Sequence, residues 1–220
     1  MKKSSKNRLT LHQQALFPGD TLFDKIARAV CRSGTLPRKE LYEAWAVAKR
    51  VRRLFRGGRI VDLACGHGLV SYILLLLDDT SPGAVAVDTH IPKNAETLSR
   101  ALIRTWPRLK DRVLFRQMPL EQMEISSQDI VVSVHACGAL TDTVIKKALS
   151  ARAKLAVLPC CHDLTTCDTG GLEGWMDGPL AIDAVRAIRL TCQGYTVMTK
   201  KIPGEITPKN RLLMAYPNES

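Results

Sequence analysis

The sequence lacks the features that mark a membrane or secreted protein. Its longest apolar run, LVSYILLLL at 69–77, is far shorter than the roughly 20 residues that a membrane-spanning helix needs. The basic N-terminal stretch has neither an apolar core nor a small-residue cleavage site, so we predict no secretory signal. Aromatic residues make up only 5% of the chain, and we find no internal repeat. We therefore expect a soluble protein without a membrane partner.

Cysteine is present, but its distribution does not indicate a disulfide framework. The seven cysteines are an odd number, scattered between positions 31 and 192 of a 220-residue chain. A chain of this length, with 45% hydrophobic and 24% charged residues, can bury a full core without covalent support. A reducing, cytoplasmic location is the simplest interpretation, with one α/β domain and a short appendage.

Acidic residues are scarce in the first quarter of the chain. Residues 1–60 hold fifteen Lys or Arg and four Asp or Glu, which accounts for the entire net charge of +11. Such asymmetry is typical of a basic segment that meets an anion, most often nucleic acid. The alternative is a solvated helix face that only keeps the protein soluble.

The basic segment has the pattern of two helices. We expect the first from about 20 to 32, a break at SGTLP (33–37), and an amphipathic second helix from 37 to 55 that Gly57-Gly58 ends. Seven basic residues, including Arg50, Arg52 and Arg53, occupy much of the surface of the second helix. We assign residues 1–57 to a basic N-terminal helical extension and 58–220 to the main domain.

After residue 58 short apolar runs alternate with amphipathic segments. The expected strands are 59–64, 84–88, 113–117, 129–136, 154–160, 195–202 and 211–217. The expected helices between them are 68–79, 94–106, 141–152 and 179–194. Alternation of this kind predicts an α/β fold with a doubly wound, mostly parallel sheet. The last two strands are joined only by a loop, so they can be neighbours only if they are antiparallel.

A glycine-rich turn, VDLACGHG at 61–68, follows the first expected strand. Gly66 and Gly68 would let the backbone approach a ligand, and the next helix offers free N–H groups. Asp62 precedes the turn, and Asp88 ends the second strand, where a carboxylate can bind both hydroxyls of a ribose. Ser71 replaces the third glycine of the dinucleotide fingerprint. The alternative is a tight strand-to-helix turn without a ligand.

Residues 62–68 resemble motif I of the class I S-adenosylmethionine-dependent methyltransferases, with Ala64 in place of the first glycine. The layout of 59–217 is similar to that fold, in which the seventh strand is inserted antiparallel beside the fifth. The resemblance implies S-adenosylmethionine as cofactor, with Met118 and Leu120 packed against adenine. The expected cofactor-binding residues are Asp62, Ala64, Cys65, Gly66, Gly68, Asp88, Met118, Leu120 and His135.

Two later elements, HACGALTD (135–142) and LPCCHD (158–163), end the fourth and fifth strands. Together with RAIRLTCQGY (186–195) and ITPKNRLLMA (206–215), they resemble one methyltransferase branch. That branch includes tRNA 2′-O-methyltransferases that modify the acceptor stem, and uncharacterised methyltransferase-like proteins. Ligands of doubly wound sheets bind across the carboxyl ends of the parallel strands. Both elements should therefore face the transferred methyl group.

The candidate catalytic residues are His135, His162, Asp163 and Cys160. A ribose hydroxyl would need a general base, for which His135 or His162 could serve, whereas a base amine would need an acceptor such as Asp163. For His135, a structural role in the turn is an equal alternative.

The adjacent cysteines at 160 and 161 favour packing beneath the cofactor or shaping of the substrate site. Neighbouring residues on an extended chain point to opposite faces, and there is no second C-x-x-C, so we predict no metal.

Our leading hypothesis is methyl transfer from S-adenosylmethionine to RNA, with tRNA as the first candidate. The expected substrate-binding residues are Arg50 and Arg53 in the basic extension and Lys209 and Arg211 near the C-terminus. One alternative is a methyltransferase for a protein or small molecule, in which the N-terminal helices form a lid. Another is a non-catalytic RNA-binding protein on a methyltransferase fold, against which the intact turn at 62–68 argues.

Overall fold

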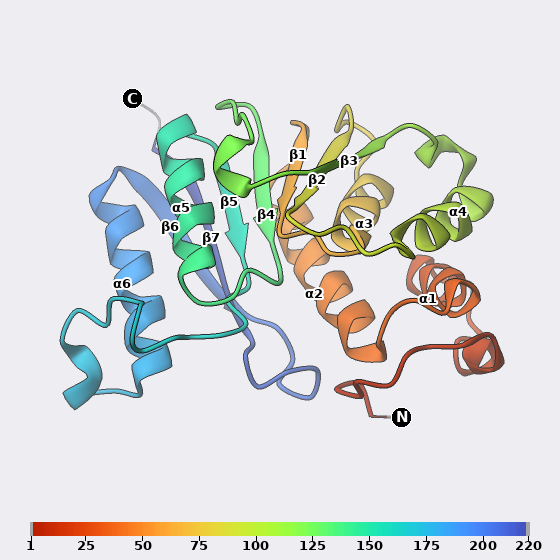
Figure 1. Ribbon diagram of the computed structural model, residues 1–220, viewed down its shortest axis with the longest axis horizontal. Coiled ribbons are helices and arrows are strands. Elements are labelled where there is room, and N and C mark those ends of the chain that lie inside the picture. The colour runs from red at the N-terminus through yellow and green to blue at the C-terminus, as the bar shows by residue number, and fades with distance from the viewer. Residues whose placement is uncertain (1, 219–220) are drawn as a thin grey trace.

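The computed structural model describes residues 2–218 and contains a seven-stranded sheet (Figure 1). The strand order is β3-β2-β1-β4-β5-β7-β6, with β1 to β5 parallel and β7 antiparallel to both β5 and β6. The strands are β1 (Ile60–Leu63), β2 (Ala84–Asp88), β3 (Val113–Gln117), β4 (Ile130–Ser133), β5 (Lys154–Val157), β6 (Tyr195–Lys201) and β7 (Arg211–Pro217). The predicted doubly wound sheet with two antiparallel final strands is confirmed.

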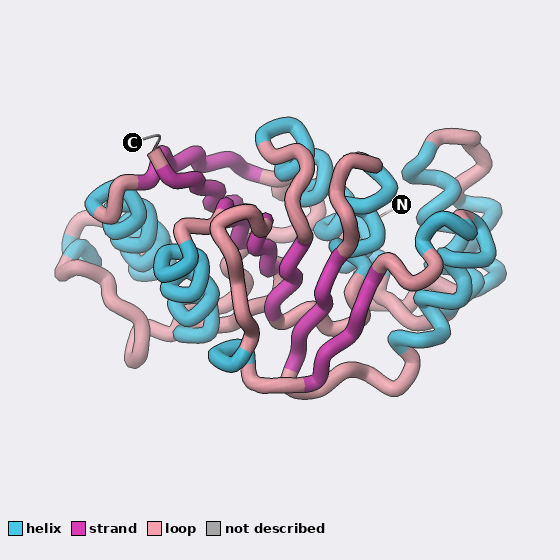
Figure 2. The backbone as a smooth tube through the Cα atoms, turned by 90° about the horizontal axis from the view of Figure 1, so that it is seen from above, coloured by secondary structure: helices cyan, strands magenta, loops and turns pink. Residues whose placement is uncertain are grey.

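Helices cover both faces of the sheet, as the view from above shows (Figure 2). They are α1 (Leu22–Ser33), α2 (Arg38–Leu54), α3 (Leu69–Leu77), α4 (Ala95–Thr105), α5 (Ala139–Ala151) and α6 (Gly178–Cys192). The first four share one apolar core, and α5 and α6 pack in a second core on the other face. Within residues 2–218, none of the helices has both the length and the apolar composition to cross a bilayer.

The basic N-terminal helices are part of the same core as the sheet. Val47 and Val51 of α2 are fully buried in one apolar cluster with Leu74 of α3 and Ile60 of β1. Burial of each aliphatic side chain contributes roughly 1.5–3 kcal/mol. Because of this packing, the surface of α2 has a fixed position relative to the strands.

One basic residue of α2 is buried. Arg52 is 2% exposed, donates hydrogen bonds to the Leu74 carbonyl (3.1 Å) and Ser81 Oγ (2.7 Å), and pairs with Asp78 at 3.2 Å. We had expected Arg52 on the basic surface. A buried guanidinium needs a carboxylate and several hydrogen-bond acceptors. Arg52 finds them on α3 and on the segment that follows it, so this side chain links α2 to that part of the chain.

Strands β4 and β5 end earlier than the sequence predicted. On one side of β4, pairing with β1 stops at the Asp62–Val132 pair, and β7 pairs with β5 only as far as Val157. Without further partners on those sides, residues 134–138 and 158–163 leave the sheet as loops. Both loops lie at the carboxyl edge of the parallel strands, as does the glycine-rich turn after β1.

Candidate functional site

The turn between β1 and α3 has the backbone shape of a ligand cradle. Ala64, Gly66 and Gly68 have φ values of +57°, +52° and +71°, all in the left-handed region. A Cβ added at Gly68 would lie 2.8 Å from the ring of Phe115, whereas one added at Gly66 would meet nothing within 4 Å. Space therefore lies open above Gly66, and Ala64 adopts a conformation that costs an L-residue roughly 1–2 kcal/mol.

Asp88 holds this turn from the end of β2. Its half-buried carboxylate accepts a hydrogen bond from the Gly66 amide at 2.9 Å and another from the His90 amide at 3.1 Å. A carboxylate offers about four lone-pair positions, so Asp88 can accept two further hydrogen bonds from a ligand. The structure thus places Asp88 directly beside the glycine-rich turn.

Asp62 lies beneath the turn and is 2% exposed. Its carboxyl group accepts a hydrogen bond from Ser71 Oγ at 2.9 Å. Burial raises the pKa of Asp62 to about 7, although the hydrogen bond from Ser71 partly opposes this effect. Ser71, which replaces the third fingerprint glycine, therefore serves as the partner of a buried acid.

The other expected cofactor residues have different surroundings. Cys65 is buried, and burial raises the pKa of its thiol, so it remains neutral at physiological pH. Met118 is half-buried at the end of β3, and its amide donates to the Asp88 carbonyl at 3.0 Å. Leu120 is 2% exposed and belongs to the apolar core beneath α5. Of the two apolar residues expected against adenine, Met118 is the more accessible.

His135 follows β4 and has a neutral imidazole. Burial lowers its pKa to about 4, and the nearby positive charges of Lys39 and His67 act in the same direction. A neutral imidazole can accept a hydrogen bond from an acceptor hydroxyl or amine. Its low pKa makes it a weak proton acceptor at neutral pH.

His162 is paired with a carboxylate of α6. Its side chain is 4% exposed, and Nε2 lies 2.8 Å from Oδ1 of Asp183 on α6. Arg211, expected to bind substrate, donates to the other oxygen of Asp183 at 2.6 Å. His162 lies in the loop after β5, and it shares the partly buried Asp183 carboxylate with Arg211. Hydrogen bonds from both partners outweigh the effect of burial and lower the pKa of Asp183.

This network continues through a buried arginine that the sequence analysis missed. Arg186 of α6 is 2% exposed and forms a two-pronged contact with Asp142 at 2.9 and 2.7 Å. It also donates to the Gly138 carbonyl at 3.0 Å and lies 3.4 Å from Asp183. The network joins the loops after β4 and β5 to α6. The sequence of α6 has the pattern of an ordinary amphipathic helix, so that pattern alone did not indicate that Arg186 links the two loops.

Asp163 forms a local turn at the surface. Its carboxylate accepts hydrogen bonds from the Thr165 amide at 2.9 Å and the Thr165 hydroxyl at 2.6 Å, and these bonds lower its pKa. The side chain remains exposed, so an acceptor amine could still reach it.

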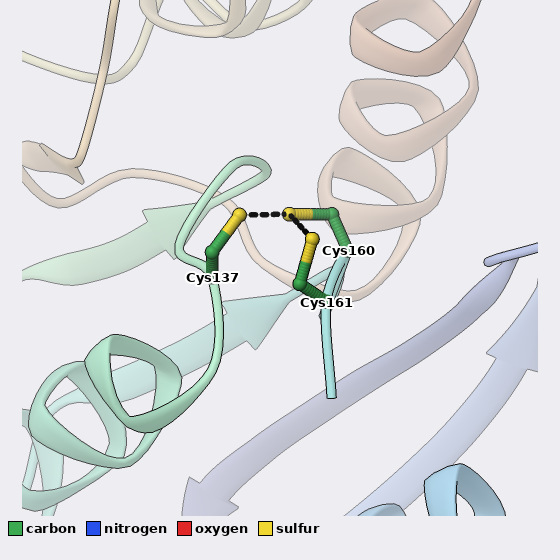
Figure 3. A group of neighbouring side chains, drawn as sticks. All are labelled: Cys137, Cys160 and Cys161. Carbon is green, nitrogen blue, oxygen red and sulfur yellow. Dashed lines mark hydrogen bonds between the residues drawn. The ribbon is translucent and has the colours of Figure 1, made fainter. Parts of the chain in front are cut away.

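Three cysteines meet where the loops after β4 and β5 approach each other (Figure 3). Cys160 Sγ lies 2.8 Å from Cys137 Sγ and 3.9 Å from Cys161 Sγ. Lys209 Nζ is 3.5 Å from Cys161 Sγ. The expectation that adjacent cysteines would point to opposite faces is wrong, because residues 158–163 are not part of a strand. Cys137, in the HACG element, completes the cluster.

A separate basic groove of about 730 Å³ lies between α2 and the strands β6 and β7. Its cationic lining consists of Lys3, Lys49, Arg50, Arg53, Lys200 and Lys201, and the lining includes no acidic residue. Its aromatic lining consists of Phe23, Tyr42 and Trp45. Lys49 Nζ lies 5.6 Å from the centre of the Trp45 ring, a cation–π distance. The expected substrate residues Arg50 and Arg53 thus share one groove, whereas Lys209 and Arg211 lie outside it.

The groove and the glycine-rich turn are separated along the sheet. Four strand-to-strand steps lead from β1 through β4, β5 and β7 to β6. At about 4.8 Å per step, β6 lies roughly 20 Å from β1, and β7, whose Met214 also lines the groove, lies roughly 14 Å from β1. A ligand that touches both the turn and the strand side of the groove must therefore span several strands.

Comparison with known proteins identifies the domain. A family model of the methyltransferase domain matches residues 40–167, more than half of the chain. The glutathione S-transferase C-terminal domain-containing proteins of Xenopus laevis and Homo sapiens are 33% and 32% identical to this chain over 106 residues. These matches cover 48% of this chain and 16% of each relative, so the chain spans less than a fifth of their length.

Solved structures share the fold at low identity. An O-methyltransferase family protein from Burkholderia thailandensis has a TM-score of 0.54 and 19% identity, over 98% of this chain and 66% of that one. The B. subtilis M1A22 tRNA methyltransferase TrmK has a TM-score of 0.51 and 15% identity, over 79% of this chain and 66% of its own. These likenesses describe the architecture alone.

Proposed function

This chain belongs to the methyltransferase domain family, with S-adenosylmethionine as its cofactor, and we propose that it methylates RNA, with tRNA as the first substrate class. The observation that carries the RNA assignment is the groove beside α2, with its six cations and three aromatic rings.

The residues around the glycine-rich turn fit the cofactor. Open space above Gly66 lets a ligand approach the backbone, and Asp88 has lone pairs left for ribose hydroxyls. The buried carboxyl of Asp62 lies below the same turn, where it can balance a positive charge on the amino acid part of the cofactor. When bound, the cofactor supplies a methyl group that its sulfonium makes electrophilic.

What the chain must add is alignment of the acceptor. Correct positioning of two reactants can account for about 7–11 kcal/mol of a barrier. The neutral imidazole of His135 can orient an acceptor hydroxyl or amine by accepting its hydrogen. We assign His162 to support of the loop after β5, because its side chain is buried against Asp183.

The groove supports RNA over a small acceptor for two reasons. Its positive charge, of which Lys3 pairs with Glu205, suits phosphates, and its half-buried aromatic rings suit stacked bases. Its strands β7 and β6 lie three and four strand positions from β1, so a substrate that reaches both the groove and the turn extends across several strands. A folded RNA meets both requirements.

The first experiment is transfer of labelled methyl from S-adenosylmethionine into a cell extract, followed by separate ribonuclease and protease digestion. Label that ribonuclease releases is the expected result. Label that only protease releases, or that appears in small molecules, would replace RNA with another acceptor.

The groove has its own test in the double variant Arg50→Ala, Arg53→Ala. We expect weaker binding of total tRNA and a slope of log affinity against log salt that is shallower by about 1–2, with unchanged cofactor binding. Lys146→Ala is the matched control, since Lys146 is an exposed cation on α5, across the sheet from the groove. Equal tRNA affinity for the double variant and the control would remove the groove from the proposal.

A further inference from the structure

The three-cysteine cluster is held in place by the backbone around it. Cys137 lies just before α5, and Cys160 and Cys161 lie in the loop after β5. The Gly138 amide donates a hydrogen bond to the Cys161 carbonyl at 3.1 Å, so the two loops are paired next to the sulfur atoms. Arg186, which binds the Gly138 carbonyl, fixes the same segment from α6. The side chains therefore meet on a prearranged support (Figure 3).

The sulfur positions suit a metal ion with tetrahedral preference. All three Sγ atoms lie within 4.8 Å of one another. Zinc–sulfur bonds of about 2.3 Å at tetrahedral angles place two ligand sulfurs roughly 3.8 Å apart, and the Cys160–Cys161 distance is 3.9 Å. The Cys137–Cys160 distance of 2.8 Å would need to widen by about 1 Å. Cys137 is exposed, so a small rotation of its side chain meets little resistance.

The charges around the cluster are also suitable. Three thiolates and one divalent ion carry a net charge of −1, and the Lys209 ammonium beside Cys161 offsets it. A soft sulfur ligand set selects zinc(II) over magnesium or calcium.

We propose that Cys137, Cys160 and Cys161 together bind one zinc(II) ion at the carboxyl edge of the sheet. Three protein ligands leave the fourth tetrahedral position free for water or a substrate atom. Cys137 and Cys161 are exposed, so this position opens toward solvent. The ion would bind the loop after β4 to the loop after β5, the two loops that we expect beside the methyl acceptor. This inference does not depend on the identity of the acceptor.

The proposal can be tested on the full chain, purified without added metal under reducing conditions. Elemental analysis is expected to find about one zinc per chain in the unaltered protein and in Cys192→Ser. Cys192 is an exposed cysteine at the end of α6, far along the chain from the cluster, and it serves as the matched control. Cys137→Ser and Cys160→Ser are expected to lose the metal while their circular dichroism spectra remain unchanged.

Cobalt(II) titration of the chelator-treated protein gives a second readout that needs no variant. We expect a thiolate-to-cobalt charge-transfer band in the near ultraviolet that saturates at one equivalent, together with protection of Cys137, Cys160 and Cys161 from alkylation. Absence of both zinc and a cobalt band would overturn the proposal. So would a Cys137–Cys160 disulfide in the peptide mass spectrum of the reduced-buffer preparation, or full zinc occupancy in Cys160→Ser.

Discussion

Replacement of Asp88 by alanine tests the assignment of the cofactor site most directly. The half-buried carboxylate already accepts hydrogen bonds from the Gly66 and His90 amides. We propose that its remaining lone pairs accept two hydrogen bonds from the ribose of S-adenosylmethionine. Asp88→Ala would therefore remove the ligand contacts and also loosen the turn that shapes the cradle.

The two effects differ in size. Loss of two charge-assisted hydrogen bonds to the ribose should weaken binding by roughly 1.5–3 kcal/mol, which is about ten- to a hundredfold in the dissociation constant. The amides of Gly66 and His90 lie near the surface and can bind water instead. Their loss should reduce the free energy of unfolding by only about 1 kcal/mol.

Titration calorimetry with S-adenosylhomocysteine measures the first effect, and urea unfolding of the ligand-free protein measures the second. Glu96→Ala provides the matched control, because it removes one exposed negative charge from the first turn of the adjacent helix α4. If Asp88→Ala binds within twofold of the control, Asp88 does not hold the ribose and the placement of the cofactor is wrong.

Three further outcomes follow from the same structure. Ala64→Gly should raise the free energy of unfolding by roughly 0.5–1 kcal/mol in urea titrations, because φ at this position is +57°; an unchanged or lower value would contradict strain at this turn. Affinity for S-adenosylmethionine should rise with pH through about 7, the pKa of Asp62, and level off roughly one unit higher, since Asp62 must lose its proton to pair with a cation; Asp62→Asn should abolish this dependence in calorimetry. Asp183→Ala should cost roughly 1–3 kcal/mol in thermal or urea unfolding, because it leaves His162 and Arg211 without their carboxylate, whereas Arg186 keeps Asp142. The lowered pKa of Asp183 adds a pH test: its stabilising effect is present above pH 4 and should be lost as the pH falls through its folded-state pKa.

The fold could be predicted from the sequence because its central strands are buried on both faces. Continuous apolar runs such as the one at 84–87 alternate with helices, and a doubly wound sheet buries such runs on both faces. The glycine-rich turn could also be predicted from the sequence, since the left-handed backbone at residues 66 and 68 favours glycine. The ends of β4 and β5 could not be predicted from the sequence, because the residue at which a strand ends depends on the length of the neighbouring strands.

Side-chain direction at the site could not be read from the sequence. His162 follows β5 and has the chemistry of a base, yet it is buried against Asp183, whose position on α6 is 21 residues further along the chain. Arg52 shows the same limit, since the pattern of α2 does not reveal which of its arginines faces Asp78. In both cases a partner distant in sequence decides the orientation, and local periodicity carries no information about that partner.

The positions of these groups suggest a division of labour within the molecule. Two of the four cationic side chains expected to bind substrate, Arg50 and Arg53, lie in the groove beside α2. The loops after β4 and β5 present a neutral imidazole and a cluster of sulfur atoms. Phosphate contacts contribute affinity without regard to the reacting atom. Binding energy obtained in the groove can then be used to position the acceptor against His135. For this reason we expect the choice of the modified nucleotide to depend on the short loops at 134–138 and 158–163. We expect the affinity for the RNA to depend on α2.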